Sequence, residues 1–321
     1  MSFTEELAAF RAAHPDIRTV EAFVTDLNGV VRGKRVPIEH IAKAGEGALR
    51  LPLSTLGLDI FGQDVPENAL ALERGDPDGV MLPIAGALAP MRWSEDTAQL
   101  ACTLVLPDGS ACGFDPRAVL ASVVARAVAL GFTPVVALEL EFYLIDPARP
   151  APPPDPLSGT VLARDQVYDL DIARAFEPVL GAIIEAARAL GAPAETAICE
   201  FGPGQFEINL GHTSDALAGA DHMIWLKRAI RGTARAQGLD ATFMAKPFGA
   251  ASGSGQHIHV SLMGDDTHNA LASVPGQGVS PRLGQAVAGL VTTMAEAMAV
   301  FAPHANSYRR FVAGSYAPPS A

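Results

Sequence analysis

Four separate stretches of the chain carry carboxylates, imidazoles or a guanidinium at short, regular spacing. The stretches are 138–142, 200–207, 253–259 and 306–310. Residues two apart in an extended strand point to the same face of a sheet, so Glu139 shares a face with Glu141, and His257 shares one with His259. Carboxylates gathered on one face repel one another unless cations lie between them. The spacing therefore predicts a cation site.

The residue types indicate which cation fits. An oxygen-rich ligand set with one or two imidazoles and no thiolate is typical of Mg²⁺ or Mn²⁺. Such ions bridge the phosphates of ATP during phosphoryl transfer, so the four stretches together predict a metal-dependent ATP site. Each stretch alone has a plainer interpretation: the glutamates fit a solvated strand face, and the histidines fit hydrogen-bonded core positions. The prediction therefore rests on the ordered set.

The composition narrows the class of protein. Of the 321 residues, 49% are hydrophobic, enough for one large domain or two ordinary ones, and the net charge is −12. This acidic balance disfavours nucleic-acid binding, which needs a basic face. Cys102, Cys112 and Cys199 form no C-x-x-C pair, which favours a reducing compartment and argues against a zinc cluster. We expect a cytoplasmic protein.

No membrane partner is expected. Residues 1–20 carry acidic and basic side chains where a signal peptide needs an apolar core. The longest apolar-rich stretch, 283–303, is interrupted by Gln285 and Glu296. We interpret it as a buried helix rather than a membrane span.

The elements that must position the polar residues alternate between helices and strands. Up to residue 112 the sequence predicts a helix over 3–14, a hairpin around Asn28-Gly29 and short strands within 80–106. Beyond it, apolar periodicity and turn residues predict further helices and strands. Helices are expected at 117–130, 176–190 and 215–237, and strands at 133–145, within 200–210 and at 241–245. The fold class is therefore α+β, with helices outside an antiparallel sheet.

These motifs, in this order, resemble those of the glutamine synthetase family, and most of all its γ-glutamylputrescine (γ-glutamylpolyamine) synthetase branch. The segments that carry the resemblance are 25–37, 135–144, 203–210, 242–247 and 306–310. The resemblance implies an N-terminal β-grasp domain over residues 1–112 and a catalytic domain over 113–321, built on a curved antiparallel sheet with outer helices. It also implies ring-shaped homo-oligomers.

The same resemblance implies ligands for two divalent ions, Mg²⁺ or Mn²⁺. Glu141, Glu200 and Glu207 correspond to ligands of one ion. Glu139 and His257 correspond to ligands of the ion that binds the ATP phosphates.

Substrate contacts follow from the resemblance as well. His259 and Ser261 correspond to nucleotide contacts, and Ser252, Gly253 and Arg310 to residues around the glutamate substrate. The implied reaction has two steps: ATP phosphorylates the side-chain carboxylate of glutamate, and an amine then displaces phosphate from the acyl phosphate. Arg310 is expected to stabilise charge on the transferring group. The amine must be neutral to attack, so a primary amine needs a base or a deprotonating environment.

Two departures from ammonia-using members of the family favour an organic amine such as putrescine. Tyr316, in the run 313–318, stands where those members carry a glutamate, and the stretch 51–59 lacks their ammonium-site motif. We expect Tyr316 to pack on the alkyl chain of the amine or to make a cation–π contact, although loop filling is the plainer interpretation. Ser252 replaces the asparagine usual at the glutamate pocket of those members.

The family's sequences continue past the point where this chain stops. The residues that follow in the family include an arginine-rich phosphate-binding segment and a further metal-ligating glutamate. The resemblance therefore implies a C-terminally truncated form, with a defective active site and exposed apolar surface.

Three alternatives to a glutamate–amine ligase stay open. They are a glutamine synthetase that uses ammonia, a non-catalytic family member that binds a metabolite or a full-length relative, and a metal-dependent hydrolase that activates water. Turnover with ammonium would favour the first, and metal binding without ATP binding would favour the second.

Overall fold

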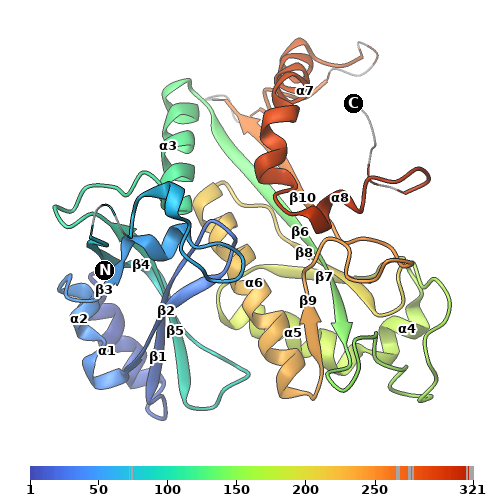
Figure 1. Cartoon of the computed structure of the whole chain (residues 1–321), viewed down its shortest axis with the longest axis horizontal. Helices are drawn as coiled ribbons and strands as arrows, with labels where there is room; N and C mark the ends of the chain where they lie inside the picture. The colour runs from blue at the N-terminus through green and yellow to red at the C-terminus, as the bar shows by residue number, and fades with distance from the viewer. Residues whose placement is uncertain are drawn as a thin grey trace. The chain divides into compact units, whose positions relative to one another are not determined.

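Two compact units make up the chain. The computed structural model describes residues 1–71, 73, 75–264, 268–273, 276, 278–315 and 317. One unit comprises Met1–Arg126 and Arg188–Ala192, and the other comprises Ala127–Ala187 and Pro193–Ala321. Helices and strands occur in both, which confirms the α+β class (Figure 1). The domain boundary expected after residue 112 stays a prediction.

The first unit is built on a five-stranded sheet in the order β2-β1-β5-β4-β3. Its strands are β1 (Thr19–Thr25), β2 (Val31–Pro37), β3 (Arg50–Pro52), β4 (Asp78–Pro90) and β5 (Thr97–Val105). β1 and β2 pair as the antiparallel hairpin expected around Asn28-Gly29, and β1 pairs in parallel with β5. The sheet is therefore mixed. Its assignment as a β-grasp domain stays a prediction.

Short helices accompany this sheet. They are α1 (Phe3–Ala13), α2 (Ala42–Gly45), and the 3₁₀ helices η1 (Ile38–His40), η2 (Leu53–Gly57) and η3 (Pro66–Asn68). α1 begins with a capping box, because the Ser2 hydroxyl accepts from the backbone N–H of Glu5 while the Glu5 carboxylate accepts from that of Ser2. Alternate residues of β1, namely Val20, Ala22 and Val24, are buried in the core of this unit.

The second unit is built on an antiparallel sheet in the order β10-β6-β8-β7, with β9 also paired to β6. Its strands are β6 (Thr133–Ile145), β7 (Ala194–Cys199), β8 (Gln205–Leu210), β9 (Asp240–Thr242) and β10 (Gln256–Met263). β6 has the predicted bounds. Glu200 lies just after β7 rather than on the strand that carries Glu207.

β9 is shorter than the strand predicted at 241–245. Past Thr242 the backbone bonds to other partners: the carbonyl of Ala245 accepts from the backbone N–H of Ser254, and the backbone N–H of Lys246 donates to Oδ1 of Asn306. On the same edge of β6, the backbone N–H of Glu141 donates to the carbonyl of Gly255, and Leu140 pairs with Gln256, so β10 takes the place of a longer β9.

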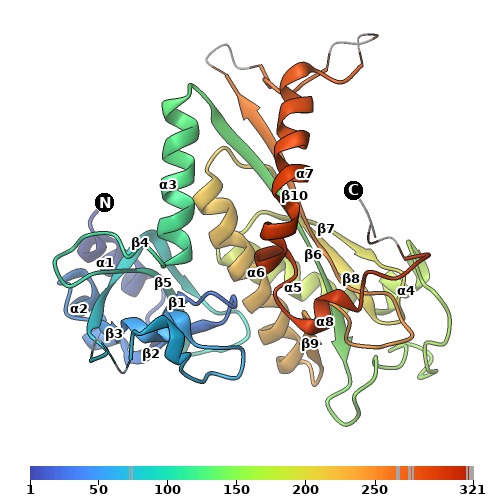
Figure 2. The same ribbon diagram turned by 45° about the horizontal axis from the view of Figure 1, so that its top comes forward.

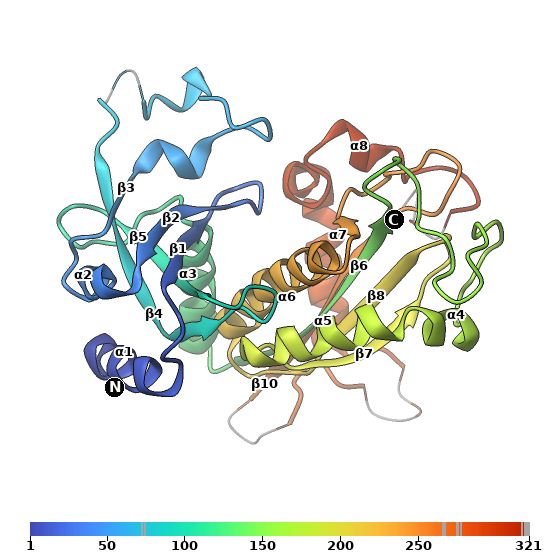
Figure 3. The ribbon, with the colours of Figure 1, turned by 90° about the horizontal axis from the view of Figure 1, so that it is seen from below.

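Helices cover the apolar face of the second sheet. α5 (Glu177–Ala189) and α6 (Ala216–Ala236) lie within the predicted helices, and α4 (Leu170–Ala175) was not predicted. α3 (Pro116–Ala129), most of which belongs to the first unit, agrees with the predicted helix to within one residue and has no buried residue. A Cβ on Gly219 of α6 would lie 2.7 Å from Val136 and 3.4 Å from Leu138, so glycine permits close packing on β6. Phe176, just before α5, stacks with its ring centroid 5.0 Å from that of Phe206. Figure 3 shows α5 and α6 beside this sheet.

The C-terminal part holds α7 (Pro281–Phe301) and the short α8 (Ala305–Tyr308) (Figure 2). α7 confirms the helix expected over 283–303, but the expectation that it is buried was wrong. None of its residues is buried, and Leu290 and Val291 are 56% and 50% exposed. The sequence identifies an apolar helix without identifying an element that covers it. Among the described residues, α7 is the helix long and apolar enough to cross a membrane by length and composition.

Candidate active site

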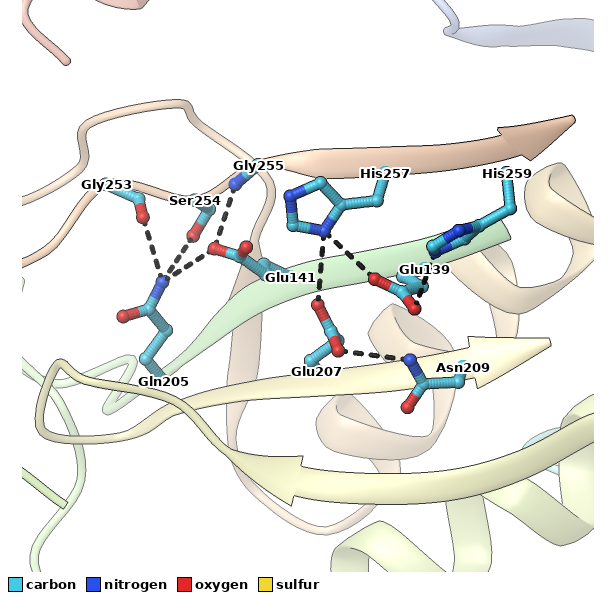
Figure 4. A network of polar contacts seen from close by, with 10 residues as sticks. All are labelled: Glu139, Glu141, Gln205, Glu207, Asn209, Gly253, Ser254, Gly255, His257 and His259. Carbon is cyan, nitrogen blue, oxygen red and sulfur yellow. Dashed lines mark hydrogen bonds and ion pairs between the residues drawn. The ribbon is translucent and has the colours of Figure 1, made fainter. Parts of the chain in front are cut away.

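Sheet register brings the predicted carboxylates and imidazoles together on the face opposite α5 and α6. β6 lies between the two strands that carry the other ligands. Glu139 is paired with His257 of β10 and with Asn209 of β8, and Glu141 is paired with Glu207. The polar side chains of these three strands therefore form one cluster (Figure 4).

Glu139 is the centre of this cluster. Its Oε2 lies 3.0 Å from Nδ1 of His257, and its Oε1 lies 3.0 Å from Nε2 of His259. Glu207 approaches from β8, with Oε2 3.9 Å from Nδ1 of His257. One ligand atom from each of Glu139, Glu207 and His257 lies within 4.8 Å of the others. These three residues could hold one metal ion.

The electrostatics of the cluster favour a divalent cation. Burial, then the charges of Glu141 and Glu207, raises the pKa of Glu200 to about 7. Burial, then the charge of Glu139, also raises the pKa of Glu207. Carboxylates that resist ionisation because of their neighbours gain most from a cation between them. Hard oxygen ligands with an imidazole and no thiolate suit Mg²⁺ or Mn²⁺, so the residues fit the predicted metals.

The metal grouping differs in one respect from the two predicted ligand sets. The resemblance separated Glu207 from Glu139 and His257, whereas the structure gathers the three. Glu200 belongs to the same cluster, because the charges of Glu141 and Glu207 contribute to its raised pKa. The division of these residues between two ions stays a prediction.

Glu141 is held at the other end of the cluster. Its Oε2 accepts from the backbone N–H of Gly255, at 2.9 Å, and from Nε2 of Gln205, at 3.2 Å. Gln205 also donates to the carbonyl of Gly253, at 3.1 Å. The carboxylate is therefore tied to the segment that precedes β10.

Arg310 lies against the two glycines of that segment. A Cβ on Gly253 would lie 2.8 Å from Cγ of Arg310, and a Cβ on Gly255 would lie 3.0 Å from its Nη2 and 3.3 Å from Oε1 of Glu141. Glycine at both positions lets the guanidinium approach the backbone and the carboxylate cluster. The predicted glutamate-binding residues Gly253 and Arg310 are thus brought together.

The other predicted residues fall nearby or outside the described part. The carbonyl of Ser252 accepts from the hydroxyl of Tyr143 at 2.7 Å, which anchors the segment to β6. Ser261 lies on β10 two residues past His259, and its hydroxyl accepts from Nδ2 of Asn269. Tyr316 lies outside the described residues.

Sequence reasoning missed two polar residues that support the site. Gln205 is fully buried against Glu141, and Asn306 exchanges two hydrogen bonds with the backbone of Lys246. The period of two within 205–210, which puts Gln205 on the same face as Glu207, was the available signal. Asn306 belongs to the stretch 306–310, in which the sequence pattern gave a role to Arg310 alone.

The comparisons with known proteins agree with this geometry. The profile of the glutamine synthetase catalytic domain matches residues 113–321. Gamma-glutamylputrescine synthetase PuuA of Escherichia coli (strain K12) is 39% identical over 326 residues, covering 100% of this chain and 69% of that protein. Glutamate–isopropylamine ligase of a Pseudomonas species is 30% identical over 311 residues, covering 94% and 67%.

A solved structure has the same fold. The GmaS/ADP complex, in its conformation 1, superposes with a TM-score of 0.81 at 28% sequence identity, and the match covers 96% of this chain and 66% of that one. The chain therefore spans about two thirds of the length of these relatives.

Proposed function

This chain belongs to the glutamine synthetase family, and we propose that it is an ATP-dependent ligase that joins the γ-carboxylate of glutamate to an amine. The observation that carries the proposal is the cluster of Glu139, Glu207 and His257 on adjacent strands, with Arg310 held beside it. The cluster suits a metal-bound phosphate, and the arginine suits a carboxylate. A γ-glutamyl phosphate intermediate connects the two, because it carries a phosphoryl group on a carboxylate.

The glutamate and histidine side chains would hold Mg²⁺ or Mn²⁺. Glu139, Glu207 and His257 supply ligands at one end of the cluster, and Glu141 and Glu200 supply further carboxylates. The ions, when bound, neutralise charge on the phosphates of ATP. His259 is hydrogen-bonded to Glu139 and would orient that carboxylate. His259 and Ser261, both on β10, would also contact the nucleotide.

Arg310 would bind the glutamate substrate. Its planar guanidinium can donate two parallel hydrogen bonds to a carboxylate, which fixes both position and orientation. Gly253 and Gly255 leave room beside it, and the carbonyl of Ser252 is anchored by Tyr143.

An organic amine is the proposed nucleophile. Two relatives are named for such amines, putrescine and isopropylamine. Tyr316 stands where ammonia-using members of the family carry an acid, which supports the same choice. We further propose that the chain forms homo-oligomers in the cytoplasm.

A ligation assay tests the proposal. This chain and a form extended to the length of its relatives are each incubated with ATP, Mg²⁺ or Mn²⁺, glutamate and one of putrescine, isopropylamine or ammonium, and both ADP and the γ-glutamyl product are measured. The extended form is expected to turn over, whereas turnover by this chain alone would overturn the expectation of a defective active site. We expect ADP release to require glutamate and an organic amine, with one amide formed per ADP. The variant E139Q should lose this activity, whereas E185Q, at an exposed position of α5, should keep it. Turnover with ammonium only would favour a glutamine synthetase. Hydrolysis of the γ-glutamyl amide in the absence of ATP, without ligation in its presence, would overturn the proposal.

A further inference from the structure

Gln205 is an uncharged side chain buried among the charged groups of the site. It is the first residue of β8 and is fully buried. Its Nε2 lies 3.2 Å from Oε2 of Glu141, 3.1 Å from the carbonyl oxygen of Gly253 and 3.3 Å from Oγ of Ser254 (Figure 4). A single amide group therefore joins the carboxylate cluster to the segment before β10.

A hydrogen bond to the amide oxygen of Gln205 fixes the orientation of the amide group. Its Oε1 accepts from the backbone N–H of Gly202 at 2.9 Å. That bond needs an oxygen, so the NH₂ group must face Glu141 and Gly253. The backbone beneath it is also held, because Nε2 of Gln166 donates to the carbonyl of Gln205 and Oε1 of Gln166 accepts from the N–H of Gly204. An amide without water around it cannot replace these bonds by solvent, so their geometry is strongly enforced.

The contacts made by Gln205 leave one oxygen of Glu141 available. Both the amide of Gln205 and the backbone N–H of Gly255 donate to Oε2. Among the described residues, none donates a hydrogen bond to Oε1, and a Cβ on Gly255 would lie 3.3 Å from this oxygen and 3.0 Å from Nη2 of Arg310. Both donors bind one oxygen, so Oε1 remains available as a ligand atom.

We propose that Gln205 is a positioning residue, which sets the affinity of the site for a divalent metal by holding the carboxylate of Glu141. The same amide ties that carboxylate to Gly253, beside which Arg310 lies, so the metal-binding and glutamate-binding parts of the site are aligned together. This inference rests on the proposed function, because it assigns Glu141 to the metal site. Outer hydrogen bonds of this kind change metal affinity by about 10–100-fold.

Direct titration with Mn²⁺, followed by electron paramagnetic resonance, tests the inference without needing turnover. Q205M keeps the volume of the side chain but removes its donor and acceptor. We expect it to bind Mn²⁺ about 10–100-fold more weakly than the unaltered chain. I183V, a core change in α5 away from the site, controls for a general loss of stability and should leave the affinity unchanged. Thermal unfolding shows that each variant is folded at the temperature of the titration.

A double-mutant cycle with E141Q separates positioning from loosening of the fold. If Gln205 acts through Glu141, Q205M should change the Mn²⁺ affinity by less than about 2-fold once Glu141 has been replaced. An undiminished effect in the E141Q background would overturn the inference. So would an unchanged affinity in Q205M alone, and the proposed function would survive either result.

A second variant covers the case in which Q205M does not fold. Q205E has the same shape and still accepts from Gly202, but it presents a carboxyl oxygen to Glu141. Two carboxyl groups this close cannot both ionise, so the charge or the position of Glu141 changes and Mn²⁺ affinity should again fall about 10-fold or more. Unchanged affinity in Q205E would overturn the inference. Absence of Mn²⁺ binding by the unaltered chain would overturn the proposed function and the inference together.

Discussion

Glu139 and His257 are register partners on adjacent antiparallel strands, and Nδ1 of the histidine lies 3.0 Å from Oε2 of the glutamate. They are separated by 118 positions in the sequence. A slip of one residue between β6 and β10 would send one of the two side chains to the apolar face. The pairing therefore makes the metal site a property of the folded sheet rather than of either strand.

Removal of a direct ligand should weaken metal binding more than removal of a supporting residue. We expect H257A to lower Mn²⁺ affinity by more than the roughly 10–100-fold typical of outer hydrogen bonds. Isothermal titration with Mn²⁺ measures the change, and E185Q on α5 serves as the control. Equal affinities for H257A and E185Q would exclude His257 from the site.

The stability of the metal-free chain should depend on pH through Glu200. Its pKa is raised from 4.5 to about 7, so the folded chain holds this proton more tightly than the unfolded chain does. The resulting stabilisation is fully present below about pH 4.5 and is lost as the pH rises through 7. Thermal unfolding in a chelator should show a falling melting temperature across this range, with a smaller fall in E200Q. Identical slopes would contradict this assignment, and added Mn²⁺ should restore stability at pH 7 and above.

Gly255 should be needed for substrate binding more than for folding. A methyl group there would lie 3.0 Å from Nη2 of Arg310, at the end of a flexible side chain that can move aside. We expect G255A to fold but to raise the KM for glutamate about 10–100-fold, because a displaced guanidinium loses its paired contact with the carboxylate, worth about 1.5–3 kcal/mol. G284A on α7 meets nothing within 4 Å and should leave KM unchanged. Equal KM values in the two variants would argue against Arg310 as the glutamate ligand.

Asn306 should stabilise the segment that leads to Arg310. Its Oδ1 accepts from the backbone N–H of Lys246 at 2.8 Å, and its Nδ2 donates to the carbonyl of the same residue at 2.9 Å. We expect N306A to lower the free energy of unfolding by about 1–3 kcal/mol, because both backbone groups lose their partner. Urea unfolding measures the change, and a loss for N306A no larger than that for the exposed substitution E185Q would contradict the pairing.

Polar substitutions on α7 should be tolerated. Leu290 is 56% exposed, so L290Q should change the free energy of unfolding by less than about 0.5 kcal/mol. Ile183 of α5 is fully buried, and I183A should cost about 2–5 kcal/mol. Urea unfolding compares them, and a large loss for L290Q would mean that α7 is covered in solution.

Local sequence patterns were sufficient to predict an element where the pattern was compatible with only one type of secondary structure. The apolar alternation of 133–145 predicted β6 with its bounds, and Asn28-Gly29 predicted the β1–β2 hairpin. In both cases the period of two, together with a turn residue, leaves no competing element. The polar face of β6 followed from the same period.

Long-range pairing was not readable from the sequence. The grouping of Glu207 with Glu139 and His257 depends on which strands are neighbours and in what register. The shortening of β9 depends on β10, which occupies the same edge of β6 from Leu140 onward. The exposure of α7 depends on packing that its composition does not specify. The role of a residue whose contacts come from distant parts of the chain can be assigned only once strand order and register are known.

The transfer of oxygen from glutamate to phosphate tests the central claim most directly. The form extended to the length of the relatives turns over glutamate labelled with ¹⁸O in its γ-carboxylate, together with ATP, Mg²⁺ and putrescine, and the released phosphate is analysed by mass spectrometry. A γ-glutamyl phosphate intermediate leaves one labelled oxygen on each phosphate, because the amine displaces the phosphoryl group together with the oxygen that attacked ATP. We predict one ¹⁸O per phosphate and one γ-glutamyl amide per ADP. Unlabelled phosphate would mean that water attacks ATP, and the ligase account would fail.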